Sequence, residues 1–131
     1  MPRCTVVRRL HFNAAHRLHN PARSDQWNRD TFGPCNNPNY HGHNYELELM
    51  VEGEISPETG YVVDVSVLKQ LAEATVIAEL DHRNLNLDVA FFRDQLPSAE
   101  NIAVYIWHQL VDRIPAGRLR RVRLWETPRN W

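Results

Sequence analysis

The feature of the sequence that most constrains the fold is a pair of stretches in which apolar and polar residues alternate. Between Thr5 and His16 most apolar side chains fall on even positions, and between His43 and Gly53 they fall on odd positions. A period of two is typical of a β-strand with one face in a core and the other toward solvent. The sequence therefore predicts two long, half-buried strands.

Two other segments repeat apolar residues every four positions, which predicts amphipathic helices. One begins after Asp64 and reaches Leu80, and the other begins after Ser98 and stops before Pro115. Asp and Ser are favoured helix N-caps because their side chains accept hydrogen bonds from the first free backbone N–H groups. A shorter helix is expected between Ser24 and Gly33.

A third strand, from Leu119 to Thr127, is expected to place Glu126 on the same face as Val122 and Leu124. The order strand, strand, helix, helix, strand, with no repeat and no linker, predicts one domain spanning residues 1–131. It indicates an α+β fold in which an antiparallel sheet has two helices packed on one face. Neighbouring subunits are expected to cover the opposite face.

Composition narrows the classes of function. The chain has 131 residues, a net charge of −1 and 43% hydrophobic residues, which favours a folded domain and argues against nucleic acid as the main partner. Two cysteines, Cys4 and Cys35, make a disulfide framework improbable and favour a reducing compartment. No apolar run reaches membrane-spanning length, so we expect a cytoplasmic protein that contacts no membrane.

Three histidines fall on matching faces of the two predicted strands. His41 and His43 are two residues apart and therefore point the same way on extended backbone, and His16 lies on the apolar face of the first strand. Three buried imidazoles would need several hydrogen-bond partners, whereas a shared metal ion would satisfy them together. The triplet predicts a metal site, and three imidazoles with an open fourth position are typical of catalytic zinc.

Three further features, two single residues and one pair, allow two interpretations each. Cys35, in a polar and turn-rich segment, is either a catalytic thiolate or an incidental loop cysteine. Asp81 and His82, at the end of the first long helix, form either a proton relay or a helix cap. Glu126 is an inward-directed charge that needs a partner, either a ligand or an ion pair.

Five segments together resemble the 6-pyruvoyltetrahydropterin synthase family. The resemblance runs through nearly the whole chain, and its ordered set of motifs is far more specific than His-x-His alone. The segments are NAAHRL at 13–18, CNNPNYHGHNY at 35–45, LDHRNL at 80–85, SAENIA at 98–103 and WET at 125–127.

The resemblance implies a role for each residue of the site. It implies that zinc binds to His16, His41 and His43. It implies that Cys35 is the catalytic base and that Asp81 with His82 forms a proton relay. It also implies that Glu126 binds the pterin ring, assisted by Ser98, Glu100 and Thr127.

The resemblance further implies a T-fold that assembles into a trimeric barrel and then a homohexamer, with active sites between subunits. The implied reaction is a zinc-dependent lyase step on 7,8-dihydroneopterin triphosphate, which releases triphosphate and yields 6-pyruvoyltetrahydropterin. Two departures stand out. Position 99 is Ala where relatives commonly have a hydroxyl, and the chain stops at Trp131 where the family continues into another strand, so the fourth strand is expected to be short or missing.

Three other functions compete with this reading. The related 6-carboxytetrahydropterin synthases of queuosine biosynthesis typically have three residues between the cysteine and His-x-His, whereas five separate Cys35 from His41 here. An aldolase-like cleavage of dihydroneopterin would use the same base. A non-catalytic pterin-binding or metal-binding protein would have little need for Cys35, Asp81 and His82.

Overall fold

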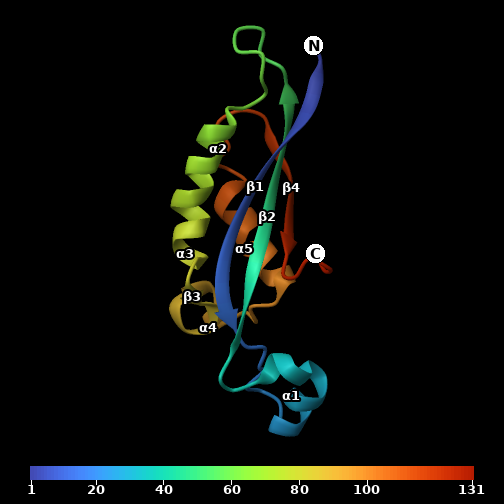
Figure 1. Cartoon of the computed structure of the whole chain (residues 1–131), viewed down its shortest axis with the longest axis vertical. Coiled ribbons are helices and arrows are strands. Elements are labelled where there is room, and N and C mark those ends of the chain that lie inside the picture. Colours follow the sequence, from blue (N-terminus) through green and yellow to red (C-terminus); the bar gives the residue numbers. More distant parts are fainter.

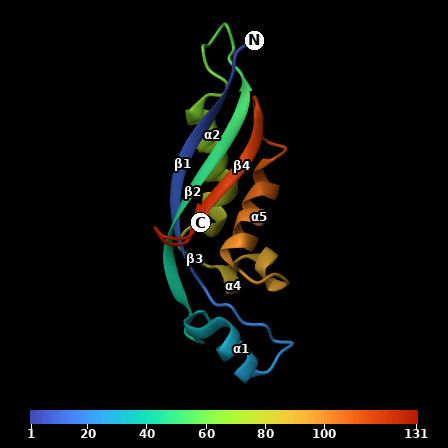
Figure 2. The ribbon, with the colours of Figure 1, turned by 90° about the vertical axis from the view of Figure 1, so that its right-hand side faces the viewer.

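The computed structural model describes residues 1–131 as one four-stranded sheet with helices on one face (Figures 1 and 2). The strand order is β3-β1-β2-β4. Figure 2 shows β1, β2 and β4 side by side, with α2 and α5 both on the far face of the sheet. The strands are β1 (Arg3–His16), β2 (His41–Glu54), β3 (Arg83–Asn84) and β4 (Arg118–Trp125).

The helix α1 lies beyond the lower end of the sheet (Figure 1). The other four α-helices follow β2 in the chain. None of them is long and apolar enough to cross a membrane. Their bounds are α1 (Asp25–Phe32), α2 (Val65–Ala72), α3 (Ala78–Leu80), α4 (Leu85–Asp88) and α5 (Ala99–Leu110). Two short 3₁₀ helices, η1 (Gly33–Asn36) and η3 (Ala90–Arg93), and one π-helical turn, η2 (Glu73–Ile77), complete the elements.

β1 and β2 form an antiparallel ladder that runs their whole length in one register. The pairing begins with Arg3 opposite Glu54 and ends with His16 opposite His41. Both predicted strands are confirmed, and β2 begins two residues earlier than the alternation alone indicated. The ladder places the apolar positions of both strands on the face that α2 and α5 cover, where Leu47 and Leu49 are completely buried.

The fourth strand differs from the prediction of a purely antiparallel sheet. β3 has only two residues and pairs in parallel with Ala14 and Ala15 of β1. It comes from the middle of the chain rather than from its C-terminal end. Beyond β4, Thr127 and Asn130 form only an isolated bridge. The strand order therefore leaves most of one edge of β1, and the whole outer edge of β4, without a partner strand in this chain.

The helix predicted from Asp64 to Leu80 is confirmed, with one π turn inside it. Asp64 caps it by accepting a hydrogen bond from the Ser66 N–H at 2.8 Å. Residues spaced by four drift by about 40° per step around an ideal α-helix. The wider turn of η2 takes up this drift. The stripe that consequently stays buried consists of Leu68, Ala72, Val76 and Leu80.

α5 and β4 close the other half of the core. Ser98 caps α5 through the Asn101 N–H at 3.2 Å, and α5 buries Ile102, Ile106 and Leu110 as its spacing predicts. Leu119 and Leu124 of β4 are five positions apart and would point to opposite faces of a regular strand. A register irregularity opposite Met50 and Val51 of β2 allows both to face the core.

The face of the sheet opposite the helices is charged. Arg9 lies 3.5 Å from Glu46, Arg123 lies 3.9 Å from Glu48, and Arg3 lies 3.1 Å from Glu52. Such partly exposed pairs contribute little to stability, yet they make this face compatible with water. Because it is charged, this face does not have to be buried by neighbouring subunits. Its coverage by other subunits therefore stays a prediction.

Two glycines with left-handed backbone provide a matched test of the packing beside β2. A Cβ on Gly117 (φ 74°) would lie 2.8 Å from the Glu52 carbonyl oxygen and 2.9 Å from Val51 Cγ1, whereas a Cβ on Gly60 (φ 79°) would meet nothing within 4 Å. Gly60→Ala should lower the free energy of unfolding by about 1–2 kcal/mol from backbone strain alone. Gly117→Ala should lower it by at least about 1 kcal/mol more, because the backbone must also shift.

Urea unfolding of both variants measures this difference. Equal losses would show that the backbone around Gly117 relaxes freely.

Candidate metal centre and adjoining pocket

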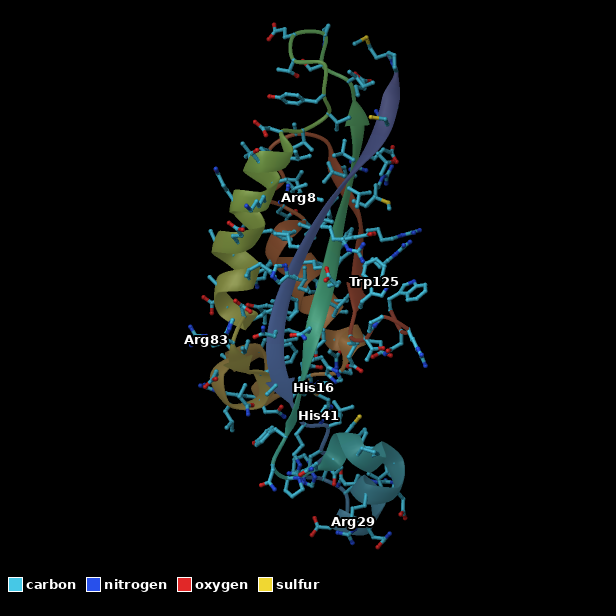
Figure 3. All side chains as sticks on the ribbon, in the orientation of Figure 1. Arg8, His16, Arg29, His41, Arg83 and Trp125 are labelled. Carbon is cyan, nitrogen blue, oxygen red and sulfur yellow. The ribbon has the colours of Figure 1, made fainter.

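The structure brings the three predicted histidines together at one end of the β1/β2 ladder. His16 and His41 are direct cross-strand partners, and His43 is the next residue on the same face. One ligating atom from each lies within 4.8 Å of the others. Figure 3 shows His16 and His41 adjacent, at the end of the sheet that faces α1. The two-residue spacing of His41 and His43, together with the register of β1 and β2, thus brings the three imidazoles together as predicted.

The orientation of His16 follows from its backbone partner. Its Nδ1 lies 2.7 Å from the carbonyl oxygen of Pro97, which can only accept, so Nδ1 carries the proton in the neutral ring. The Nε2 atom then has a free lone pair directed at His41 Nε2, 3.0 Å away. A hydrogen bond from a metal ligand to a backbone carbonyl is the usual means of setting a ligand's orientation.

The three imidazoles are suited to a metal cation. Burial lowers the pKa of His16, of His41 and of His43, so all three are neutral at pH 7 and offer lone pairs. His43 Nε2 is buried without any hydrogen-bond partner. Nitrogens on a tetrahedral zinc ion, at ~2.0–2.1 Å from it, lie roughly 3.3–3.4 Å apart, and here the His16 and His41 Nε2 atoms are 3.0 Å apart and all three ligand atoms lie within 4.8 Å of one another. The donor set therefore fits zinc.

Glu126 lies beside the histidines, as its predicted strand face implied. Its carboxylate oxygens are 3.9 Å from His16 Nε2 and 3.9 Å from His43 Nε2, and its side chain is 19% exposed. It follows β4 directly, and Leu124 on the same face is buried in the core. The inward direction of this charge is confirmed, and its neighbours are neutral imidazoles rather than an arginine or lysine.

Cys35 and Glu126 line the same cavity, of about 700 Å³, between α5 and β4. Cys35 is half-buried in η1, and burial, followed by the charge of Glu126, raises the pKa of its thiol. The thiol is therefore protonated at pH 7 and needs a change in its surroundings before it can act as a base. The polar side chains that share the cavity with it are Ser98, Glu100, Arg121, Arg123, Glu126 and Asn130.

Asp81 and His82 form a pair that is attached to the edge of β1. His82 Nδ1 lies 2.9 Å from an Asp81 oxygen. The other Asp81 oxygen accepts from the Asn13 N–H at 3.0 Å, and the His82 N–H donates to the Asn13 carbonyl at 2.6 Å. The Asn13 N–H, more than His82, lowers the pKa of Asp81. The pair is thus more than a helix cap, because it connects α3 to the sheet.

Within one chain, the Asp81–His82 pair and Cys35 line different hollows. His82 lines a smaller hollow with Asn13, His43 and Arg83. Its side chain is 77% exposed, and its backbone is left-handed at φ 60°, an uncommon conformation for a residue other than glycine.

The remaining residues predicted to bind the substrate line two different hollows. Ser98 and Glu100 line the cavity of Cys35, and Ala99 lines it without a hydroxyl group. Thr127 instead lines a separate hollow on the other side of Glu126, and its hydroxyl pairs with the Asn130 side chain. The structure therefore groups Thr127 with Glu126 but not with Cys35.

Sequence reasoning missed two features of the site. Tyr45, two residues beyond His43 on the same face, is completely buried and its hydroxyl has no hydrogen-bond partner. Its spacing from His43 was the available signal. The Pro97 carbonyl that orients His16 could not have been found, because a backbone group 81 residues away leaves no pattern in the sequence.

The fold and the site define a class: small α+β proteins with a cluster of three histidines that could hold a metal ion, beside a pocket that contains a carboxylate and a thiol. The sequence profile of the family described as 6-pyruvoyl tetrahydropterin synthase matches residues 5–131. The chain belongs to this family.

Individual relatives agree with this assignment. The human 6-pyruvoyl tetrahydrobiopterin synthase is 46% identical over 125 residues, covering 95% of this chain and 86% of the human one. The structure of Caenorhabditis elegans 6-pyruvoyl tetrahydropterin synthase superposes with a TM-score of 0.94 at 41% identity, covering 99% and 93% of the two chains. A Pyrococcus furiosus dihydroneopterin monophosphate aldolase is 35% identical, covering 92% of this chain and 88% of the aldolase.

The metal centre can be tested by metal analysis. His43→Ala should lose most of its bound zinc, because two imidazoles hold the ion far less tightly than three. His108→Ala, an exposed histidine on α5, is the control and should bind one zinc ion per chain like the unaltered protein. Full zinc occupancy in His43→Ala would place the metal elsewhere.

Proposed function

We propose that this protein is a zinc-dependent 6-pyruvoyltetrahydropterin synthase, a carbon–oxygen lyase that converts 7,8-dihydroneopterin triphosphate to 6-pyruvoyltetrahydropterin. The observation that carries the proposal is the position of the Glu126 carboxylate, which lies 3.9 Å from two of the three clustered histidines and lines one cavity with the thiol of Cys35. The human relative, similar along 95% of this chain, is named for this activity. The free cysteines agree with a reducing, cytoplasmic location.

We assign recognition of the pterin ring to Glu126. A carboxylate accepts two parallel hydrogen bonds, which matches the pair of N–H donors on the guanidine-like edge of a pterin. Glu126 has no arginine or lysine partner, so the ligand would supply its missing donors. Ser98 and Glu100 line the same cavity and would contact the ring beside it, whereas Thr127 would act from the far side of Glu126.

Zinc held by His16, His41 and His43 would lower the pKa of the substrate's side-chain hydroxyls and polarise a carbonyl formed there. Cys35 would take a proton from the side chain. Because the charge of Glu126 helps to keep the Cys35 pKa high, donors from the bound ring would reduce that effect and favour the thiolate. His82, oriented by Asp81, would exchange protons with the substrate during triphosphate elimination and the internal redox shift.

The separation of the proposed catalytic residues within one chain supports an active site formed between copies of the chain. Cys35 and His82 line different hollows of one chain, while β4, and β1 over all but the two residues that pair with β3, offer unpaired edges at opposite sides of the sheet. We propose that β1 of one copy pairs with β4 of the next to close a trimeric barrel, and that two barrels form a homohexamer. Each cavity would then receive an Asp81–His82 pair from a neighbouring copy.

The relative from Pyrococcus furiosus, which is named as an aldolase, makes aldol cleavage the second candidate. The two reactions, and that of a 6-carboxytetrahydropterin synthase, start from dihydroneopterin compounds but leave different products. Purified protein incubated with 7,8-dihydroneopterin triphosphate should release triphosphate and form 6-pyruvoyltetrahydropterin, identified by mass. A side-chain aldehyde split from the ring, a 6-carboxy product or no reaction would each contradict the proposal.

The role of Cys35 has a matched control in the second free cysteine. Cys35→Ala should keep its zinc and its unfolding midpoint but lose turnover by at least about a hundredfold, because general base catalysis typically contributes that much. Cys4→Ala, at an exposed position on β1, should be nearly silent. Comparable turnover in the two variants would show that Cys35 has no catalytic role.

The role of Glu126 is separable from the metal. Glu126→Gln should weaken pterin binding by about ten- to a hundredfold, because an amide replaces one of two acceptors with a donor and loses the charge. Zinc content should stay the same, and the ligand-free protein should be as stable or more stable, since a half-buried charge is removed. Calorimetry and thermal unfolding, with Glu54→Gln at the opposite end of β2 as control, measure both effects.

If affinity were unchanged and stability fell sharply, Glu126 would instead be a structural partner of the histidines.

A further inference from the structure

Asn36 is a buried polar residue next to Cys35 to which the proposed mechanism gives no task. It is only 6% exposed and is the last residue of η1, the four-residue 3₁₀ helix that carries the thiol. A 3₁₀ helix of this length has few hydrogen bonds of its own, so contacts with other elements set its position. The hydrogen bonds that join η1 to the residues just after β1 all involve Asn36 or the Cys35 carbonyl oxygen.

Asn36 binds the segment that leaves the end of β1. Its Nδ2 atom donates to the Leu18 carbonyl oxygen at 2.8 Å and to His19 Nδ1 at 3.0 Å. An amide nitrogen can only donate, so His19 Nδ1 is the acceptor. The Asn36 carbonyl oxygen accepts from Arg17 Nε at 2.9 Å. The Leu18 N–H donates to the Cys35 carbonyl oxygen at 2.8 Å. Cys35 and Asn36 are therefore held against this segment by side-chain and backbone hydrogen bonds together.

The segment that receives these hydrogen bonds is itself fixed in place. The Asn86 side chain of α4 accepts from the Arg17 N–H at 2.8 Å and donates to the Arg17 carbonyl oxygen at 2.9 Å. His16, the last residue of β1 and a member of the cluster of three histidines, directly precedes Arg17. Asn36 therefore connects the turn that carries Cys35 to a fixed point between the histidines and α4.

A second buried asparagine supports the rest of the segment between β1 and β2. Asn28, which is completely buried, accepts from the Asn20 N–H at 2.6 Å and donates to the Asn20 and Ser24 carbonyl oxygens at 2.9 Å each. These bonds hold the preceding turn onto α1, beyond the lower end of the sheet (Figure 1), and none of them reaches η1. What the bonds of Asn36 add is the position of η1 relative to the histidines.

We propose that Asn36 is a positioning residue that holds the Cys35 thiol at the cavity beside the histidines. This inference rests on the proposed function, in which Cys35 takes a proton from the side chain of the substrate. Proton transfer requires the base within about 2.6–3.2 Å of its partner atom. A displacement of about 1 Å can lower the rate about a hundredfold. Recognition of the pterin ring is assigned to Glu126, which follows β4, so loss of Asn36 should affect the chemical step more than binding.

Asn36→Ala tests the inference by separating kcat from KM. With 7,8-dihydroneopterin triphosphate as substrate, we expect kcat to fall about ten- to a hundredfold while KM changes by no more than about twofold. Zinc content should be unchanged. Asn28→Ala is the matched control, because it removes the other buried asparagine of the same segment. It should lower the unfolding midpoint through its lost hydrogen bonds and leave kcat unchanged. An equal loss of kcat in both variants would show that Asn36 only stabilises this segment.

The reactivity of the Cys35 thiol reports its position without any turnover. In a Cys4→Ala background Cys35 is the only cysteine that can react with iodoacetamide. Asn36→Ala should raise the alkylation rate about three- to tenfold, because loss of one or two hydrogen bonds lets η1 expose the half-buried thiol. Asn28→Ala should not change this rate.

His19→Phe is a second variant that keeps Asn36 and removes one of its acceptors. It should change kcat and the alkylation rate in the same directions by smaller factors, and it replaces Asn36→Ala if that variant does not fold. Unchanged kcat in the variant that folds would overturn the inference, whatever its alkylation rate.

The two measurements keep this inference separable from the proposed function. If the unaltered protein released no triphosphate, the proposed function would fail, and the alkylation rates would still decide whether Asn36 holds Cys35 in place. If the unaltered protein turned over its substrate and Asn36→Ala did so equally fast, only the role of Asn36 would fail.

Discussion

The single register of the β1/β2 ladder is the constraint on which the rest of the structure depends. It runs from Arg3 opposite Glu54 to His16 opposite His41, and the apolar residues of both strands face the helices along its whole length. A slip by one residue would turn the core face outward and separate the histidines at the same time. Burial of the core therefore enforces the convergence of the three histidines.

The same ladder explains why the site is polar in an otherwise apolar layer. The core stripe of β2 runs without change of face from Val51 down to Tyr45, and His43 and His41 continue it toward the end of the sheet. Beyond that point the helices no longer cover the strands completely, and the Pro97 carbonyl, Glu126 and Cys35 approach instead. Neutral imidazoles beside a carboxylate that has no basic partner form an environment that a divalent cation and a donor-rich ligand would both stabilise.

The acid–base groups of the site are distributed over elements that differ in rigidity. The histidines and Tyr45 belong to long paired strands, Cys35 to a short turn, and Asp81 and His82 to a segment attached to β1 by two backbone contacts with Asn13. The left-handed conformations of Tyr40, just before His41, and of His82 mark the two places where the chain turns sharply into the site. This placement of the acid–base groups on separate elements suits the proposed active site, which is completed only when copies of the chain assemble.

The sequence by itself determined the two long strands, the caps and buried stripes of the main helices, the convergence of the three histidines and the inward direction of Glu126, because each follows from a local period or from cap chemistry. It also indicated the family through motifs in a defined order. Only the tertiary structure decided the two-residue parallel β3, the π turn that keeps Leu68 and Leu80 on one side, and the separation of His82 from Cys35. It alone identified the Pro97 carbonyl as the partner of His16 and the Tyr45 hydroxyl as unpaired. These features depend on contacts between residues distant in the chain, and such contacts leave no periodic pattern in the sequence.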